Sequence, residues 1–261
     1  MENLKYCPLE SPLIFDTHAH YDDSRFDEFR DELLNSLPRH GVGGIITCGC
    51  DGESSKSALS IADSYDYIYA AVGIHPGNIK SGTEISEIKE LAKNKKCVAI
   101  GEIGLDYYWE KDNREEQIRI FEEQLILADQ LNLPVIVHDR DAHADTLEIL
   151  KKHKPKGVVH CFSGSVEMAE EILKIGMYIG VGGVVTFKNA KKLPEVINAL
   201  PFDRMLLETD SPYLAPVPFR GKICHSAMIY FTAEKIAELK GITIEEILNF
   251  SRKNTKDLFG V

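Results

Sequence analysis

One unit recurs along this whole sequence and limits the folds open to it. Each copy has a short β-branched or apolar run, a turn with Gly, Asp, Pro or Ser, and an amphipathic helical stretch. Because the runs are almost continuously apolar, the strands are expected to be buried on both faces, as in parallel sheets. Eight strands are predicted, at Leu13–His20, Gly43–Cys50, Ile68–Pro76, Cys97–Asp106, Pro134–Arg140, Gly157–Gly164, Tyr178–Phe187 and Met205–Pro212.

Eight strand and helix units predict one α/β domain over residues 1–261, a (β/α)8 TIM barrel. No Pro-, Gly- or Ser-rich linker divides the chain. An open, doubly wound sheet of eight strands uses the same local units and stays an alternative. Asp112 and Thr243, each followed three residues later by Glu, predict two helix starts, the second for a last helix near Ile247–Asn254.

The composition limits the possible partners and the location. With 41 acidic and 30 basic side chains, the net charge is −11, which argues against a protein that coats DNA or an anionic membrane by bulk charge. A local site for a phosphodiester stays possible. No apolar run approaches the roughly 18 residues that span a bilayer, and the first residues lack the pattern of a signal peptide. We therefore expect a cytoplasmic protein with no membrane partner and no obligate protein partner.

The cysteines show neither CxxC pairs nor the density of a disulfide scaffold, so they are predicted to be reduced thiols. Cys48 and Cys50 share one face of the second predicted strand, a spacing that also suggests redox chemistry. We interpret both as buried small side chains. The six cysteines are Cys7, Cys48, Cys50, Cys97, Cys161 and Cys224.

Polar residues stand where the predicted strands end. His18 and His20 are spaced i, i+2 on a strand, so both imidazoles point to the same side and can share a metal ion. Alone, such a pair is as often two ordinary histidines. Asp16 is interpreted as a carboxylate that supports ligands rather than as a ligand. Four further candidates follow apolar strand cores, namely Glu102, His138, His160 and Asp210.

These candidates are significant as a group, because the carboxyl ends of barrel strands meet on one face and would bring the residues together. Four imidazoles and two carboxylates around one pocket are typical of a site for transition-metal dications rather than for calcium. His75, at the end of the third strand, is predicted to contact a phosphate, the alternative being a histidine held by the turn at Pro76. Arg140 and Arg220 are candidate phosphate contacts, although Arg140 has acidic neighbours with which it can pair.

At this point the sequence resembles the TatD family of metal-dependent hydrolases, often described as deoxyribonucleases. The resemblance extends from Asp16 to Gly260. The motifs that carry it are DTHAH (Asp16–His20), GIHP (Gly73–Pro76), GEIGLDYY (Gly101–Tyr108), VHDRDA (Val137–Ala142), HCFSG (His160–Gly164), ETDSPY (Glu208–Tyr213) and PVPFRGK (Pro216–Lys222). One departure is Ile223–Ser226, where the family usually has an Asn and a Pro, and this puts the substrate contacts of that loop in doubt.

The resemblance implies a TIM barrel with two divalent cations. It implies that Glu102 bridges them, that His18, His20 and Asp210 complete one site, and that His138 and His160 complete the other. We expect a hydrolase that cleaves phosphodiester bonds, in DNA above all, with an activated water and with Asp210 as general base or as ligand only. The ligand types favour Zn, Mn or Co, whereas the resemblance suggests Mg.

Two rival functions stay open. An amidohydrolase or deaminase on the same barrel would use the same histidines and aspartate, but many such enzymes bridge their metals with a carbamylated lysine. The fourth predicted strand has Glu102 and no lysine between Cys97 and Gly104. The other rival is a non-catalytic barrel that binds a nucleotide or a metal, which the complete ligand set disfavours.

Overall fold

The computed structural model describes residues 11–109 and 111–261, and its eight parallel strands form one sheet in sequence order. A bridge between Ala19 and Ser211 joins the segment after the last strand to the first strand, and the Asp210 N–H donates to the His18 carbonyl at 2.9 Å. The predicted barrel is confirmed and the open sheet is wrong. The strands are β1 Ile14–Ala19, β2 Val42–Cys48, β3 Ile68–Val72, β4 Cys97–Asp106, β5 Val135–Arg140, β6 Gly157–Val159, β7 Tyr178–Val181 and β8 Met205–Leu207.

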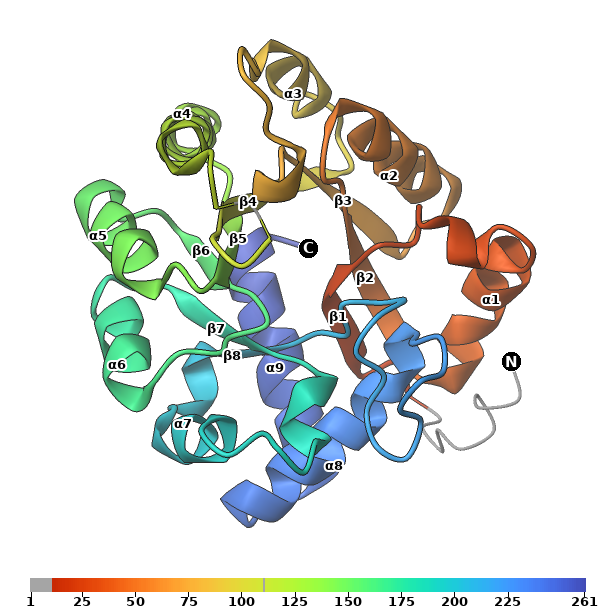
Figure 1. The fold of residues 1–261 in the computed structure, drawn as a ribbon. Helices are drawn as coiled ribbons and strands as arrows, with labels where there is room; N and C mark the ends of the chain where they lie inside the picture. The colour runs from red at the N-terminus through yellow and green to blue at the C-terminus, as the bar shows by residue number, and fades with distance from the viewer. Residues whose placement is uncertain (1–10, 110) are drawn as a thin grey trace.

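The helices surround the strands as an outer ring (Figure 1). The last helix crosses one end of the barrel, where Phe259 packs in the same cluster as Phe15 and Tyr178. The α-helices are α1 Arg30–Ser36, α2 Gly52–Ser64, α3 Ser86–Leu91, α4 Arg114–Leu131, α5 His143–His153, α6 Val166–Lys174, α7 Leu193–Ala199, α8 Ile229–Lys240 and α9 Ile244–Phe259.

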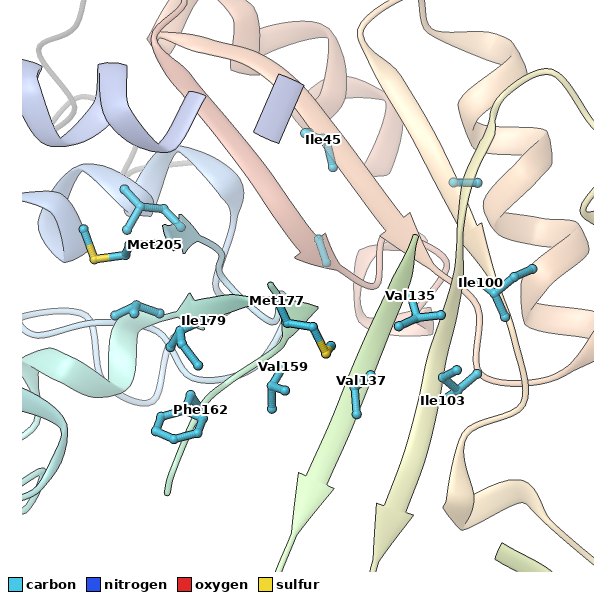
Figure 2. Packing of buried hydrophobic residues seen from close by; sticks show 14 of the residues in the cluster. Ile45, Ile100, Ile103, Val135, Val137, Val159, Phe162, Met177, Ile179 and Met205 are labelled. Atoms are coloured by element: carbon cyan, nitrogen blue, oxygen red, sulfur yellow. The ribbon is translucent and has the colours of Figure 1, made fainter. Parts of the chain in front are cut away.

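Two apolar layers hold the barrel together. Alternate residues of a strand point to opposite faces, so Val135 and Val137 pack in the larger cluster while Ile136 packs in the inner one. Figure 2 shows part of the larger cluster, including Ile179 and Met205 from neighbouring strands. Each such aliphatic side chain contributes roughly 1.5–3 kcal/mol when it is fully buried. The strands are therefore fixed firmly enough to position the residues that follow them.

Several strands end earlier than the sequence predicts. The predicted strand Gly157–Gly164 ends at Val159, because Cys161 has φ of 44° and leaves the extended conformation. The strand predicted for Tyr178–Phe187 gives way to a 3-10 turn at Gly183–Thr186. The polar residues that follow these strands consequently lie in loops.

One of the two predicted helix starts is right. Thr243 and Glu246 form the expected capping box, and α9 runs from Ile244 to Phe259. The prediction for Asp112 is wrong, because α4 begins at Arg114 after Asn113 and its N-cap makes no side-chain hydrogen bond to the helix backbone.

Two expectations from composition can be compared with the described residues. Within them, every cysteine is a free thiol, as predicted, while Cys7 lies outside them. Among these residues, too, we find no helix that is both long and apolar enough to cross a membrane.

Candidate metal centre

The six predicted metal-ligating residues lie together at the carboxyl ends of the strands. Gly104 helps to bring two of these strands close, since a Cβ at this position would lie 2.0 Å from the carbonyl oxygen of His138. The six are His18 and His20 at the end of β1, Glu102 in β4, His138 in β5, His160 after β6 and Asp210 after β8.

Glu102 stands at the centre of the cluster. Its Oε1 lies 2.8 Å from His138 Nδ1 and 2.8 Å from His160 Nε2. Its Oε2 lies 3.4 Å from His18 Nε2 and 3.5 Å from His20 Nε2. Each carboxylate oxygen therefore faces one pair of histidines, which is the arrangement that a carboxylate bridging two cations requires.

Asp210 completes the group on one side of Glu102. Its Oδ1 lies 3.6 Å from His18 Nε2 and 3.4 Å from His20 Nε2, and these two nitrogens are 3.0 Å apart. Ligand atoms that hold one zinc-sized ion at about 2.1 Å in tetrahedral geometry lie about 3.4 Å apart. The three side chains thus fit one cation without rearrangement of the backbone.

Two members of the cluster, Glu102 and His18, have the charge state that cation binding needs. Burial alone would raise the pKa of Glu102, but the neighbouring imidazoles, with His160 first, hold it well below its usual value. Burial lowers the pKa of His18 to about 4, so this ring is neutral at physiological pH. Metal binding needs an ionised carboxylate and a neutral imidazole.

Asp106 orients His138 through the ring nitrogen that does not face Glu102. Its Oδ2 lies 3.2 Å from His138 Nε2, while its Oδ1 accepts the backbone N–H groups of Tyr108 and Trp109, each at 2.9 Å. Because the Asp106 carboxylate accepts, Nε2 keeps its proton, and Nδ1, which faces Glu102, is the nitrogen that can lose its proton and bind a cation. The sequence analysis did not single out Asp106, although it belongs to the GEIGLDYY motif.

We expect cation binding to tighten as the pH rises. Burial disfavours a charged His138, but its bonds to Asp106 and Glu102 outweigh burial and raise its pKa to about 9. Below that pH a proton must leave before Nδ1 can bind a cation, so affinity should increase about tenfold per pH unit towards 9. Calorimetric zinc titrations in two buffers of different ionisation enthalpy measure the released proton. Asp106→Asn should reduce this dependence, and an affinity that is constant from about pH 6 to pH 9 would contradict the explanation.

The interpretation of both cysteines as buried small side chains is confirmed for Cys48 and wrong for Cys50. Cys48 is buried, yet its Sγ lies 3.5 Å from His18 Nδ1. Cys50 is only half-buried, and its Sγ lies 3.8 Å from His20 Nδ1 and 4.0 Å from Glu102 Oε2. The available signal was their place at the carboxyl end of β2, where the other strands carry their polar site residues.

Asp16 links the first strand of the barrel to the segment that follows the last strand. Its Oδ2 accepts the hydroxyl groups of Thr209 at 2.6 Å and Ser226 at 2.7 Å, and its Oδ1 accepts the backbone N–H groups of Thr209 and His18. Asp16 thus holds β1 against the loop after β8, in keeping with a supporting carboxylate. Ser226, in the segment Ile223–Ser226 that differs from the usual family sequence, contributes to this link.

His75 is both held by its turn and directed into the site. Its Nδ1 accepts the Gly77 N–H at 3.0 Å, so a neutral ring carries its proton on Nε2, which lies 3.6 Å from Glu102 Oε1. Burial lowers the pKa of His75 to about 4. A neutral ring with this proton is a hydrogen-bond donor, which suits the predicted phosphate contact better than metal ligation.

The two predicted arginines differ in position. Arg140 lies over the rings of Tyr108 at 4.4 Å and Trp109 at 5.5 Å and lines the cleft beside the cluster. Its acidic neighbour Asp139 instead bonds His143 at 2.7 Å. Arg220 packs over Phe187 at 3.7 Å and is not among the residues that line this cleft.

A cleft of about 650 Å³ opens from His138, His160 and Asp210. Its wall carries Arg140 together with Lys191 and Lys192, two residues that the sequence analysis did not single out. The apolar residues that line it include Phe162, Val184, Leu193 and Leu214. Cations beside an apolar surface are suited to a ligand with both phosphate and ring groups.

Comparison with known proteins identifies a family and several similar proteins. The family described as TatD related DNase matches residues 15–260. An uncharacterized metal-dependent hydrolase of Bacillus subtilis, YabD, is 43% identical over 95% of this chain and all of its own length. An uncharacterized metal-dependent hydrolase of Escherichia coli, YcfH, is 36% identical over 95% of this chain and 96% of its own length. The crystal structure of YjjV, a TatD homolog from Escherichia coli, superposes with a TM-score of 0.90 at 35% identity, covering 96% of this chain and 99% of that one.

Proposed function

The chain belongs to the TatD family of metal-dependent hydrolases, and on this premise we propose that it cleaves phosphodiester bonds, with DNA as the main substrate class. The observation that carries the proposal is the placement of Glu102, whose two carboxylate oxygens each face a pair of histidines. That placement suits two divalent cations, one with His18, His20 and Asp210 and the other with His138 and His160.

The ligand atoms fit such cations in kind as well as in position. Imidazole nitrogens with carboxylate oxygens suit Zn, Mn or Co, and carboxylates alone suit Mg. When bound, two divalent cations neutralise the charge that develops on a phosphoryl group and lower the pKa of water. We therefore propose two divalent cations per chain as cofactors.

Asp210 is the proposed general base. Its Oδ1 faces His18 and His20, while we find no hydrogen bond to its Oδ2 from any residue within 11–109 and 111–261. Burial would raise the pKa of Asp210, but the bond to His20 and the other imidazoles lower it below its usual value. The group is thus ionised at neutral pH and has an oxygen free to accept a proton. His75 is proposed to donate its Nε2 proton to a phosphoryl oxygen.

The substrate must be recognised locally, because the protein carries a net charge of −11 and repels a polyanion at long range. Arg140, Lys191 and Lys192 supply positive charge beside the cluster. Within the described part of the chain, we find no salt bridge from these three side chains to an acidic residue. We propose that they bind the substrate phosphate next to the one that is cleaved, and that Arg220 acts further from the cleft.

A reconstitution assay tests the function. The metal-free protein should be inactive, and added Zn, Mn, Co or Mg should restore hydrolysis of bis(p-nitrophenyl) phosphate and of a single-stranded oligonucleotide. A cyclic amide assayed in parallel should stay intact. Hydrolysis of the amide alone would support the amidohydrolase alternative, and phosphodiester cleavage that survives full chelation would contradict the proposal.

The lysines of the cleft give a sharper prediction. Replacing Lys191 and Lys192 together by alanine should raise the KM for a short oligonucleotide about five- to tenfold, because a phosphate contact is lost. The KM for bis(p-nitrophenyl) phosphate, which has no second phosphate, should hardly change. Lys93 and Lys95 precede β4 at the opposite end of the barrel, and their double alanine variant is the matched control. An equal rise for both substrates would contradict a second phosphate subsite.

A further inference from the structure

Each imidazole of the candidate centre has one ring nitrogen near the carboxylates and a second one that needs an orienting partner. In four of the five rings that second nitrogen has one. The pairs are His18 Nδ1 with Cys48 Sγ at 3.5 Å, His20 Nδ1 with the Cys48 carbonyl at 2.9 Å, His75 Nδ1 with the Gly77 N–H at 3.0 Å and His138 Nε2 with Asp106 Oδ2 at 3.2 Å. Within the described residues, His160 Nδ1 has no hydrogen-bond partner although it is buried.

Glu208 faces this unpartnered nitrogen. Its Oε1 lies 3.8 Å from His160 Nδ1, and its Oε2 is buried and likewise without a hydrogen bond among the described residues. Glu208 is 1% exposed and His160 is 5% exposed, so water does not reach either side chain freely. Two buried side chains that face each other therefore each keep one polar atom without a hydrogen bond among the described residues.

The barrel makes room for this pair. His160 follows β6 and Glu208 follows β8, and β7 lies between these two strands. A Cβ on Gly180 of β7 would lie 2.5 Å from Glu208 Oε2 and 2.9 Å from the Cα of His160. Glu208 Oε1 also accepts the N–H of Cys161, the residue after His160. Glycine at position 180 thus admits the Glu208 carboxylate beside His160.

The position of the proton on the His160 ring explains why Nδ1 and Glu208 Oε1 are too far apart for a hydrogen bond. His160 Nε2 lies 2.8 Å from Glu102 Oε1, so a neutral ring without a cation donates its single proton there. A cation that takes the Nε2 lone pair requires that proton to reside on Nδ1. Glu208 is the acceptor in front of Nδ1, and a movement of roughly 1 Å brings the two atoms to hydrogen-bond distance.

We propose that Glu208 is a positioning residue for the metal centre, which accepts a hydrogen bond from the Nδ1–H of His160 and so leaves the Nε2 lone pair for the cation. It acts on His160 as Asp106 acts on His138. This inference rests on the proposed metal centre but not on the identity of the substrate. Its consequence is that Glu208 strengthens the cation site to which His160 belongs, although it touches neither cation nor substrate.

Zinc affinity tests the proposal. In titrations of the full-length, metal-free protein against a competing chelator, Glu208→Ala should bind one of two zinc ions about 10- to 100-fold more weakly, as is typical when such a partner is removed. Glu208→Gln should recover most of the affinity, because its amide oxygen can stand in for Oε1. Asp106→Ala should weaken one ion to a similar degree, while the exposed Glu195→Ala is the matched control without effect. Equal zinc affinities in Glu208→Ala and the unsubstituted protein would overturn the proposal.

A measurement on the unsubstituted protein keeps the proposal testable if Glu208→Ala fails to fold. Nitrogen-15 histidine spectra, with His160 assigned by its absence in His160→Asn, report which ring nitrogen carries the proton. Zinc should move the His160 proton to Nδ1, and a proton that stays off Nδ1 in the zinc-loaded protein would overturn the inference. Failure of the unsubstituted protein to bind zinc would overturn the metal centre as well. Zinc binding without phosphodiester cleavage would instead count against the proposed substrate alone.

Discussion

Replacing Glu102 by alanine is expected to remove both cations and to lower turnover about 10⁴-fold, a modest share of a typical enzymatic rate enhancement. The reason is geometric. Oε1 lies 2.8 Å from a nitrogen of each histidine of one pair, and Oε2 lies within 3.5 Å of a nitrogen of each histidine of the other. No other single carboxylate among residues 11–109 and 111–261 appears in both groups of contacts. Elemental analysis of the purified variant against the unsubstituted protein measures the loss.

His138→Ala is the matched comparison, since His138 faces only one carboxylate oxygen of Glu102. It should empty mainly one site and leave the ion held by His18, His20 and Asp210. Two ions retained in Glu102→Ala would remove Glu102 from the bridging position. Equal loss of both ions in His138→Ala would show that the two groups of ligands do not act separately.

The strand cores could be predicted because a parallel strand buried on both faces is apolar at nearly every position. The strand β4 spans Cys97–Asp106, as predicted. The later strands could not be bounded in this way. Cys161 and Asp210 adopt φ of 44° and 61° shortly after β6 and β8. A cysteine gives no sequence signal of this left-handed conformation, and an aspartate favours it only statistically.

The predicted ligands are close in space because each follows a strand core, and the barrel brings the carboxyl ends of its strands together. Residues whose role depends on a contact with a side chain from another strand could not be found in this way. Glu208 becomes meaningful only once the carboxyl ends of β6 and β8, which lie on either side of β7, are placed in space. Lys191 and Lys192 reach the cleft from a loop that follows a 3-10 turn, which the sequence analysis had assigned to a strand.

Replacing Asp210 by asparagine should abolish phosphodiester hydrolysis while both cations stay bound. Asparagine has the same shape and keeps one oxygen that can face His18 and His20, so the ligand group is only weakened. It cannot accept a proton from water, however, and loss of a general base typically costs about 10²- to 10⁴-fold in rate. The measurements are kcat for bis(p-nitrophenyl) phosphate and metal content on the same preparation.

The pH dependence gives the second half of this test. Because the pKa of Asp210 lies below its usual value, the base is ionised throughout the neutral range, and activity that needs the ionised form is lost only as the pH falls through that lowered pKa. An increase in kcat around neutral pH must then come from another group and should vanish with the rest of the activity in Asp210→Asn.

Cys161 and Ser163 also line the cleft, and burial raises the pKa of the Cys161 thiol, which disfavours its use as a nucleophile. Alanine variants of these two residues should therefore keep turnover within a few-fold. Full activity in a metal-loaded Asp210→Asn would show that Asp210 is a ligand only, and loss of activity in either alanine variant with its metals in place would point to a covalent mechanism instead.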